Sequence, residues 1–331
     1  MENHFTRTFP DVMRGKKIVY FHGFGSSARS GTVALLAELL PSTTIRAVDI
    51  PIRPAEALEL LHDFCDQEQP DLIIGTSMGG MYAEQMTGYD RLLVNPAFQI
   101  GETMTKHGMV GKQTFQNPRA DGVGEFFVTK ALVKEYAEAA SHCFSQVDEE
   151  ERRRVVGMFG DADPVVHTYD LFREHYPTAI RFHGEHRLND KEALHYLIPI
   201  IRQIDDRQQQ RQRPIVYISW DAMTDAYGKP TASLHKAYEA LIEHYCVYVV
   251  APAPTDNPQS LAARMAWVDE WLSAPAHDSV VFTNQPQLLY GDYFIGAREC
   301  RDFMGTSIVW GSEEMKTWEE IIVFFDRLGG Q

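Results

Sequence analysis

The serine at position 77 has the sequence surroundings of an activated nucleophile. An apolar run from Leu72 to Ile74 leads into Gly75, and Ser77 stands at the centre of a G-x-S-x-G pattern that ends at Gly79. In such a pattern a buried strand delivers the serine to a sharp turn, and a helix leaves at once. Glycines are needed on both sides because the crowded, strained turn has no room for a Cβ atom. The pattern therefore predicts a nucleophile elbow, although short glycine patterns also recur by chance.

A histidine–glycine turn follows an early apolar strand, which we expect over Lys17 to Phe21. The turn reads His22-Gly23-Phe24. A serine that attacks a carbonyl carbon needs preorganised N–H donors, because negative charge develops on the oxygen only in the tetrahedral state. We expect these donors to be the backbone N–H groups of Phe24 and of Met78, the residue after the serine. The alternative is a glycine-rich loop that merely turns the chain.

Two acidic residues are candidates for the third member of a catalytic triad. Asp161 and Asp163 both follow a strand expected over residues 155–159. Either carboxylate could hold an imidazole in the correct tautomer and stabilise its charged form. We favour Asp163, because the spacing G-x-x-D-x-V-V is usual in hydrolases and Pro164 would fix the direction of the loop. Two solvated loop aspartates are the competing interpretation.

Three histidines lie near the last strand that we expect in this half of the chain, over residues 180–182. They are His183, His186 and His195. A serine hydroxyl is inert at neutral pH until a base takes its proton, and histidine is the usual base. His186 best matches the loop between the last strand and the last helix, whereas His195 falls inside that helix, predicted over residues 190–204. Serine, aspartate and histidine then occur in the order of an α/β-hydrolase, each just past a strand.

The first half of the chain predicts a parallel sheet, because short apolar strands alternate with amphipathic helices. Further strands are expected over residues 45–50 and 91–94, and helices over residues 31–40 and 54–68. The segment from Gly101 to Arg154 departs from this alternation. It contains a predicted helix with Leu132, Tyr136 and Ala139 facing inward. We interpret it as a small lid or, equally, as an excursion without a gating role.

Residues 17 to about 204 resemble the YqiA-like esterases of the α/β-hydrolase superfamily. The resemblance implies Ser77 as nucleophile, His186 as general base and Asp163 as its orienter. It also implies activity on esters or thioesters of small acyl compounds, without a metal or an organic cofactor. The stretches that carry the resemblance are the Asp163 and His186 loops together with Tyr20-Phe21-His22-Gly23-Phe24, Ser26-Ser27, Gly75-Thr76-Ser77-Met78-Gly79-Gly80 and Val94-Asn95-Pro96-Ala97.

A polar run separates this half from a second α/β pattern. Residues 205–213 read DDRQQQRQR, and Pro214 ends them. We interpret the run as a linker or an exposed helix tail. Beyond it the sequence predicts short strands and amphipathic helices again, in a smaller domain. The strands are expected over residues 215–220, 246–251, 279–282, 293–295 and 307–309, and the helices over residues 230–244, 259–272 and 317–328.

The second half resembles the deoxyribonucleotidase-like branch of the haloacid dehalogenase (HAD) superfamily. The stretches that carry this resemblance are Val247-Tyr248-Val249-Val250-Ala251-Pro252, Asn257-Pro258, Trp267-Val268, Gly291-Asp292-Tyr293-Phe294-Ile295 and Trp318-Glu319-Glu320. That family uses a D-x-D motif at the end of its first strand, with a nucleophilic first aspartate.

This chain differs from that family at the positions that carry out the family's phosphoryl-transfer reaction. Ser219 replaces the nucleophilic aspartate, Ala251 replaces a hydroxyl residue, and Gly296 and Ala297 replace paired aspartates. Of those positions only Asp221 keeps its carboxylate. Phosphoryl transfer of this kind needs several carboxylates around Mg²⁺, because that ion prefers oxygen ligands. We therefore expect a degenerate, non-catalytic domain, with phosphatase chemistry from Ser219 as the minor alternative.

The composition of the chain limits the classes of molecule that we expect it to bind. The chain has 331 residues and a formal net charge of −15, so polyanions such as nucleic acid are poor partners. Its four cysteines form no C-x-x-C pair, which argues against a zinc or disulfide framework. The N-terminal residues contain no apolar signal-peptide core, and no run is long and apolar enough to span a membrane. We expect a cytoplasmic protein, compatible with a homo-oligomer.

The whole sequence thus predicts an α/β protein of two domains. Residues 1–204 form an α/β-hydrolase with a lid insertion at about 101–154, residues 205–213 a linker, and residues 214–331 a Rossmann-like HAD-type domain. The predicted activity is serine hydrolysis of a carboxylic ester or thioester, with no metal and no cofactor. The rival hypotheses are a binding or scaffold protein that retains both folds, and a Mg²⁺-dependent nucleotidase.

Overall fold

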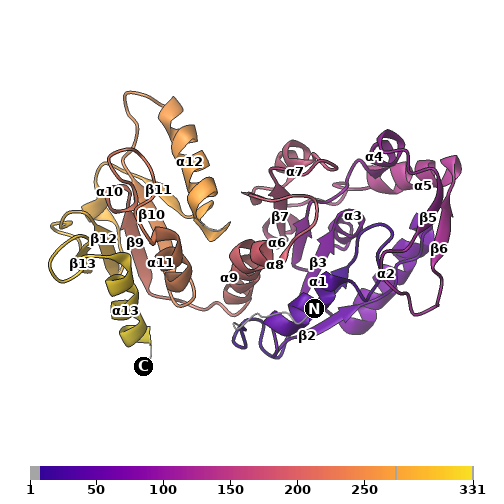
Figure 1. Ribbon diagram of the computed structural model, residues 1–331, viewed down its shortest axis with the longest axis horizontal. Coiled ribbons are helices and arrows are strands. Elements are labelled where there is room, and N and C mark those ends of the chain that lie inside the picture. The colour runs from indigo at the N-terminus through magenta and orange to yellow at the C-terminus, as the bar shows by residue number, and fades with distance from the viewer. Residues whose placement is uncertain (1–7, 273, 330–331) are drawn as a thin grey trace. The chain divides into compact units, whose positions relative to one another are not determined.

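The computed structural model describes residues 8–272 and 274–329, which divide into two compact units, Met1–Glu192 and Ala193–Gln331 (Figure 1). The expectation that the N-terminal residues contain no signal-peptide core involves residues 1–7, which lie outside the described residues. No helix in the described part of the chain is both long and apolar enough to cross a membrane.

A six-stranded parallel sheet forms the first unit, in the order β2-β1-β3-β4-β7-β8. Strand β3 lies in its interior, and residues 72–75 of it are fully buried. A parallel sheet is covered on both faces, so its strands are continuous apolar runs rather than alternating ones. The prediction of a parallel sheet is confirmed. The strands are β1 Lys17–Phe21, β2 Thr44–Ala47, β3 Leu72–Thr76, β4 Arg91–Val94, β7 Val155–Gly160 and β8 Ala179–Phe182.

The helices of this unit begin and end close to the expected positions. Helix α2 starts at Pro54, whose missing N–H costs nothing in the first turn, and it ends where Gln69 takes a positive φ of 46°. The predicted strand over residues 45–50 is shorter, because pairing with β1 stops at Ala47. The helices are α1 Gly31–Leu39, α2 Pro54–Glu68, α3 Met78–Glu84 and α7 Tyr169–His175.

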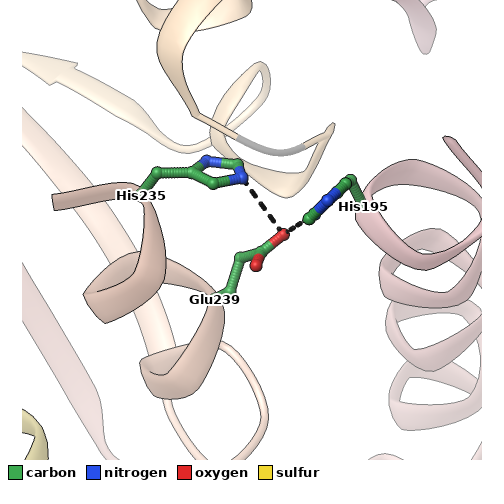
Figure 2. Close-up of side chains that lie close together, drawn as sticks. All are labelled: His195, His235 and Glu239. Carbon is green, nitrogen blue, oxygen red and sulfur yellow. Dashed lines mark hydrogen bonds and ion pairs between the residues drawn. The ribbon is translucent and has the colours of Figure 1, made fainter. Parts of the chain in front are cut away.

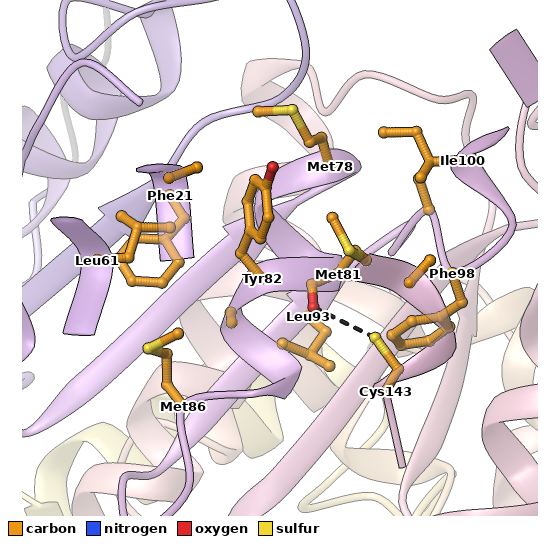
Figure 3. Close-up of a cluster of buried hydrophobic side chains, with 14 of the residues drawn as sticks. Phe21, Leu61, Met78, Met81, Tyr82, Met86, Leu93, Phe98, Ile100 and Cys143 are labelled. Carbon is orange, nitrogen blue, oxygen red and sulfur yellow. Dashed lines mark hydrogen bonds between the residues drawn. The ribbon is translucent and has the colours of Figure 1, made fainter. Parts of the chain in front are cut away.

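The core of the first unit fixes helix α3 against the sheet (Figure 3). Phe21 on β1, Leu61 on α2, Tyr82 on α3 and Leu93 on β4 are all fully buried. Burial of a large apolar side chain contributes about 1.5–3 kcal/mol to the free energy of unfolding. The direction in which α3 leaves the sheet, and hence the position of its first residue, Met78, is therefore set by packing.

The insertion between β4 and β7 carries a hairpin that the sequence did not predict. Each strand has only four residues, and the first, GKQT, contains no apolar side chain, so only the second, EFFV, carries an apolar run. The expected helix is present, and Leu132, Tyr136 and Ala139 are buried as predicted. The elements are α4 Ile100–Lys106, the antiparallel pair β5 Gly111–Thr114 and β6 Glu125–Val128, α5 Lys130–Ser141 and α6 Glu151–Arg154.

The helix predicted over residues 190–204 consists of three segments. They are α8 Asp190–Glu192, the π-helical turn η1 Ala193–Leu197 and α9 Ile198–Gln208. Pro199 explains the wide turn, because a proline cannot donate to the carbonyl four residues earlier and its ring collides with that carbonyl in an α-helix. The affected carbonyl belongs to His195, which lies in η1.

The boundary between the two units lies before residue 193 rather than within residues 205–213. Of the two interpretations of the polar run, the helix tail is closer than the linker: α9 continues to Gln208, although Asp205 in it is fully buried rather than exposed. Arg213 forms an ion pair with Asp206 at 2.7 Å and donates to the Glu243 carbonyl oxygen. Polarity alone indicated a linker, but specific partners within the second unit hold these charges.

A five-stranded parallel sheet forms the second unit, in the order β11-β10-β9-β12-β13. Its core includes Trp318, which is fully buried. The strands are β9 Ile215–Ser219, β10 Cys246–Ala251, β11 Val280–Phe282, β12 Tyr293–Gly296 and β13 Thr306–Val309. The helices are α10 Trp220–Met223, α11 Leu234–Leu241, α12 Gln259–Trp271 and α13 Trp318–Gly329, with 3₁₀ turns η2 Ala274–Ala276 and η3 Pro286–Leu288.

Helix α11 is shorter than the predicted helix over residues 230–244. Pro230 forms an isolated β-bridge with Thr224, and Ser233 has a positive φ of 64° at the start of the helix. A helix cannot include a residue with a left-handed backbone, so α11 begins at Leu234.

Candidate active site

Ser77 lies on a strained turn between β3 and α3. Its φ and ψ are 54° and −117°, a conformation that costs a non-glycine residue about 1–3 kcal/mol. The Ser77 N–H donates to the Val94 carbonyl oxygen at 3.0 Å, which holds the turn against β4. Added Cβ atoms at Gly75 and Gly79 would lie 2.4 Å from the Gly79 oxygen and 2.1 Å from the Phe21 oxygen. The two glycines are therefore required by contact with backbone atoms.

A chain of hydrogen bonds links Ser77, His186 and Asp163. The Ser77 Oγ lies 3.1 Å from His186 Nε2, and His186 Nδ1 lies 2.7 Å from Asp163 Oδ2. The Asp163 carboxylate accepts only, so Nδ1 carries the hydrogen and Nε2 is left to accept from the serine hydroxyl. The His186 side chain is 21% exposed and that of Asp163 is 0% exposed. The serine thus has a base in reach, and the base has a fixed tautomer.

Asp163 is held as a carboxylate. Its burial raises the pKa, but hydrogen bonds from His186 and from the backbone N–H groups of Val165 and Val166 outweigh this, so the pKa lies below its usual value. The two backbone bonds are 2.7 Å and 3.0 Å long and end on Oδ1, opposite the oxygen that faces His186. Both oxygens of the carboxylate are therefore fixed in place.

The alternative triad candidates His183, His195 and Asp161 pair with residues other than Ser77 and His186. His183 pairs with Asp161 at 3.0 Å, and the two side chains are 82% and 45% exposed. The Gly184 N–H also donates to Asp161. His195 lies in η1 and contacts Glu239 in the second unit. Of the alternatives that the sequence left open, Asp163 and His186 are the pair at Ser77.

The histidine–glycine turn lies directly beside the serine. A Cβ added at Gly23 would be 3.4 Å from the Ser77 Cβ, so Phe24 follows at the rim of the same site. Met78 is the first residue of α3, and the first N–H groups of a helix have no acceptor within that helix. One expected donor residue thus follows Gly23, which lies beside Ser77, and the other follows Ser77 itself in the chain.

His22 maintains the shape of this turn. It is 2% exposed; its Nδ1 donates to the Gly23 oxygen at 2.9 Å and its Nε2 accepts from the Ile50 N–H at 3.0 Å. Burial lowers the pKa of His22 to about 4. The residue is therefore a neutral imidazole that bridges the turn and the segment after β2.

Asn95 supports both loops that carry the histidine and the acid. Its Nδ2 donates to the carbonyl oxygens of Glu185 and His186 at 3.1 Å, and its Oδ1 accepts from the Gly160 N–H at 2.7 Å. The residue has a positive φ of 44° at the end of β4. From the sequence, Asn95 was noted only within the stretch Val94-Asn95-Pro96-Ala97, which carries the family resemblance. An asparagine there was the available signal, since its amide fits a left-handed backbone and offers donors and an acceptor.

The insertion between β4 and β7 is hydrogen-bonded to the loops around Ser77. The Gln116 N–H donates to the Gly25 oxygen at 2.8 Å, and the Ser27 hydroxyl donates to the Pro118 oxygen at 2.9 Å. Arg187, next to His186, donates to the Gln116 side chain at 2.9 Å. The segment after β5 therefore contacts both the histidine–glycine turn and the His186 loop.

The second unit brings the degenerate positions together at one sheet edge. Ser219, Ala251 and Gly296 end the neighbouring strands β9, β10 and β12. The Asp221 carboxylate lies close by and accepts from the Ala297 N–H at 3.2 Å. The side chains at this edge are thus a serine hydroxyl, an alanine methyl group and the Asp221 carboxylate, together with a glycine.

The fold and the Ser77 site together define an α/β-hydrolase. Residues 17–201 match the model of the uncharacterised protein family UPF0227, and the chain belongs to that family. The match confirms the resemblance to the YqiA-like esterases that the motifs of the first half indicated.

The second half is similar to a different kind of protein. The chain is 30% identical over 102 residues to a protein of Vibrio phage KVP40 named "Putative 5'(3')-deoxyribonucleotidase". The match takes in 30% of this chain and spans 60% of the length of the phage protein.

Among solved structures, the similar chains include esterases. Est1E from Butyrivibrio proteoclasticus is 13% identical with a TM-score of 0.40, and the match covers 62% of this chain and 92% of Est1E. The esterase domain of a Rhodothermus marinus protein is 14% identical with a TM-score of 0.41, covering 62% and 90% of the two chains. These likenesses are too distant to carry an argument about function.

Proposed function

We propose that this protein is a serine hydrolase that cleaves a carboxylic ester or thioester of a small molecule through an acyl-enzyme on Ser77. The observation that carries the proposal is the hydrogen-bonded chain from Ser77 Oγ through His186 to a buried Asp163, built on a strained elbow. A strained backbone at a residue with this chemistry is typical of a functional site.

The proposed reaction uses each group in turn. His186 Nε2 takes the proton of Ser77 as Oγ attacks the acyl carbon, and the N–H groups of Phe24 and Met78 bind the oxyanion. The imidazolium, stabilised by Asp163, then gives its proton to the leaving alkoxide or thiolate as the acyl bond to it breaks. Water activated by His186 hydrolyses the acyl-enzyme and restores Ser77. The reaction needs no metal and no organic cofactor.

The proposal also covers the class of substrate, the cellular location and the role of the insertion. The net charge of −15 disfavours polyanionic partners and supports a small-molecule substrate over nucleic acid. All four cysteines are free thiols, which supports a reducing, cytoplasmic location. The contacts of the insertion with the Gly25 and Arg187 loops support its assignment as a cover over the substrate.

A fluorophosphonate probe and the Ser77→Ala variant test the nucleophile. We expect the purified protein to be labelled on Ser77 and to hydrolyse p-nitrophenyl esters or acyl thioesters. Ser77→Ala should lose labelling and at least about 10³-fold of the activity. Its melting temperature should stay near that of the wild type, because alanine keeps the backbone turn. Labelling and turnover that survive in Ser77→Ala would refute the assignment, and an unlabelled wild type would favour a scaffold protein.

Asp163→Asn and Asp161→Asn form a matched pair for the acid. In an asparagine at position 163 the amide oxygen is needed to accept from the Val165 and Val166 N–H groups, so the NH₂ group faces the ring. That group donates to Nδ1 instead of accepting from it, which favours the wrong tautomer. We expect Asp163→Asn to lower kcat by about 10⁴-fold. Asp161→Asn alters the exposed contacts with His183 and the Gly184 N–H, neither of which reaches the Ser77–His186 pair, and should leave kcat near the wild-type value. The opposite ranking of the two variants in steady-state kinetics would assign the acid to Asp161.

A further inference from the structure

We propose that the second unit contains a binding site for a divalent transition metal of the zinc class, formed by His195, His235 and Glu239. Each residue offers one ligand atom, and these atoms all lie within 4.8 Å of one another (Figure 2). All three residues belong to the unit Ala193–Gln331. The site is separate from Ser77 and from the degenerate edge at Asp221.

The spacing of the donors fits a small cation. Zinc binds imidazole nitrogen at about 2.0–2.1 Å and carboxylate oxygen at about 2.0–2.2 Å, so two ligands of a tetrahedral ion lie roughly 3.4 Å apart. His235 Nε2 lies 3.4 Å from Glu239 Oε1. His195 Nδ1 contacts the same oxygen directly. To bind an ion between them, the His195 ring would have to move back from the carboxylate.

Two helical segments present the three side chains. His235 and Glu239 are four residues apart on α11 and therefore lie on the same face of that helix. His195 comes from η1, the wide turn that Pro199 imposes. In Figure 2 the two α11 side chains and the His195 ring point toward one another. The side chains of His195 and Glu239 are 24% and 21% exposed, and that of His235 is 46% exposed, so the site stays open to an entering ion.

The tautomer of His235 is the second observation that points to a cation. His235 Nδ1 lies 3.3 Å from the Trp271 carbonyl oxygen, which can only accept, so Nδ1 carries the hydrogen. In the neutral ring Nε2 is then a bare lone pair that faces an oxygen of the Glu239 carboxylate. Two acceptors face each other there unless a positive charge lies between them. A carbonyl that fixes the outer nitrogen of a metal-binding histidine is the usual supporting contact in metal sites.

The chemical types of the three ligand atoms determine which ion the site would bind. Two imidazoles and one carboxylate suit zinc and its transition-metal neighbours, whereas Mg²⁺ prefers oxygen ligands. Three protein ligands leave a fourth position for water. The competing interpretation is a proton-bridged cluster in which His235 is charged and no metal binds.

Metal titration of the tag-free, chelator-treated full chain tests the site. With Zn²⁺ we expect one site of micromolar or tighter affinity by calorimetry, and with Co²⁺ the intense visible absorption of a four- or five-coordinate ion. Weak absorption typical of octahedral, hydrated Co²⁺ in the wild type would overturn the proposal without any variant.

Variants assign the ligands. Glu239→Gln and His195→Gln keep the size of the side chains and should weaken Zn²⁺ binding at least about tenfold, because each removes one of three ligands. His277→Gln is the matched control: His277 forms a comparable pair with Asp269 at 2.7 Å but lies outside the cluster, so affinity should not change. Equal Zn²⁺ affinity in the wild type and in both ligand variants would refute the site. Far-ultraviolet circular dichroism of each variant would verify that the fold persists.

Discussion

Identical side chains have different roles in this protein because their surroundings differ. His186 is partly exposed, hydrogen-bonded to an anion and in reach of a serine hydroxyl. His22 is buried between two backbone groups and has a pKa of about 4. His183 is exposed and pairs with Asp161. At the scale of the residue, the partners of each ring decide whether it faces a hydroxyl, bridges two backbone groups or pairs with a carboxylate at the surface.

His22 should make the stability of the protein sensitive to acid. The unfolded residue binds a proton as the pH falls below about 6.5, whereas the buried ring resists protonation down to about 4. Unfolding is therefore favoured increasingly as the pH falls through this interval, by roughly 3 kcal/mol in total. His22→Gln keeps a donor and an acceptor but does not titrate. We expect the unfolding free energy of the wild type, measured by urea denaturation, to fall more steeply from pH 6.5 to 4 than that of His22→Gln. Parallel curves would contradict the assignment.

At the scale of elements, the site depends on the close approach of α3 to the strands beside it. Strand β1 and helix α3 meet where Gly79 touches the backbone of Phe21. The core around Tyr82 then holds α3 in this position. Loops from β4, β7 and β8 converge on Asn95, which ties the acid loop and the histidine loop to one amide. The elements thus determine where the three catalytic side chains meet.

Gly79→Ala should damage both the fold and the site. The new Cβ would lie 2.1 Å from the Phe21 oxygen, so α3 or β1 must shift. We expect the free energy of unfolding to fall by about 1–3 kcal/mol or more, with loss of esterase activity.

Gly31→Ala is the control, because a Cβ at Gly31 meets nothing within 4 Å. Gly31 begins α1, and alanine there should be neutral or stabilise the protein by about 0.5–1 kcal/mol. Thermal and urea denaturation of the pair provide the comparison. Equal destabilisation by the two substitutions would show that the close approach at Gly79 does not matter.

At the scale of the whole molecule, one unit carries the proposed hydrolytic site, and the other carries a sheet edge that we interpret as a degenerate phosphatase site. In the second unit the sheet and the core around Trp318 persist, while Ser219, Ala251 and Gly296 occupy the edge where the chemistry would lie. Fold and catalysis separate because the apolar residues that stabilise the sheet are different from the polar residues at its edge.

The second unit should release no phosphate from nucleotides. We expect the full chain carrying Ser77→Ala to hydrolyse no deoxynucleoside monophosphate with Mg²⁺, and Ser219→Asp in addition to restore nothing, because the other Mg²⁺ ligands are still missing. A colorimetric phosphate assay, run beside an active deoxyribonucleotidase, measures this. Phosphate release that depends on Mg²⁺ and stops with EDTA would overturn the degenerate interpretation.

Much of the site was predictable from the sequence because it lies at strand ends. Ser77, Asp163 and His186 each lie within a few residues of the end of an apolar strand, and parallel strands bring such loops to one edge of a sheet. The family resemblance and the strand–helix alternation gave the parallel sheet and the positions of Ser77, Met78 and the histidine–glycine turn. The net charge of the sequence indicated which classes of partner to expect. These properties depend on local patterns, which the chain displays directly.

Other properties depend on contacts between residues far apart in the chain, and only the tertiary structure decided them. The sequence favoured Asp163 but left Asp161 open, and the structure pairs Asp161 with His183 and Asp163 with His186. The polar run at residues 205–213 indicated a linker until its partners in the second unit were visible. The cluster of His195, His235 and Glu239 was missed, and no metal site was expected, because His195 joins the other two only through packing. A sequence shows which residues could react, whereas folding determines which of them meet.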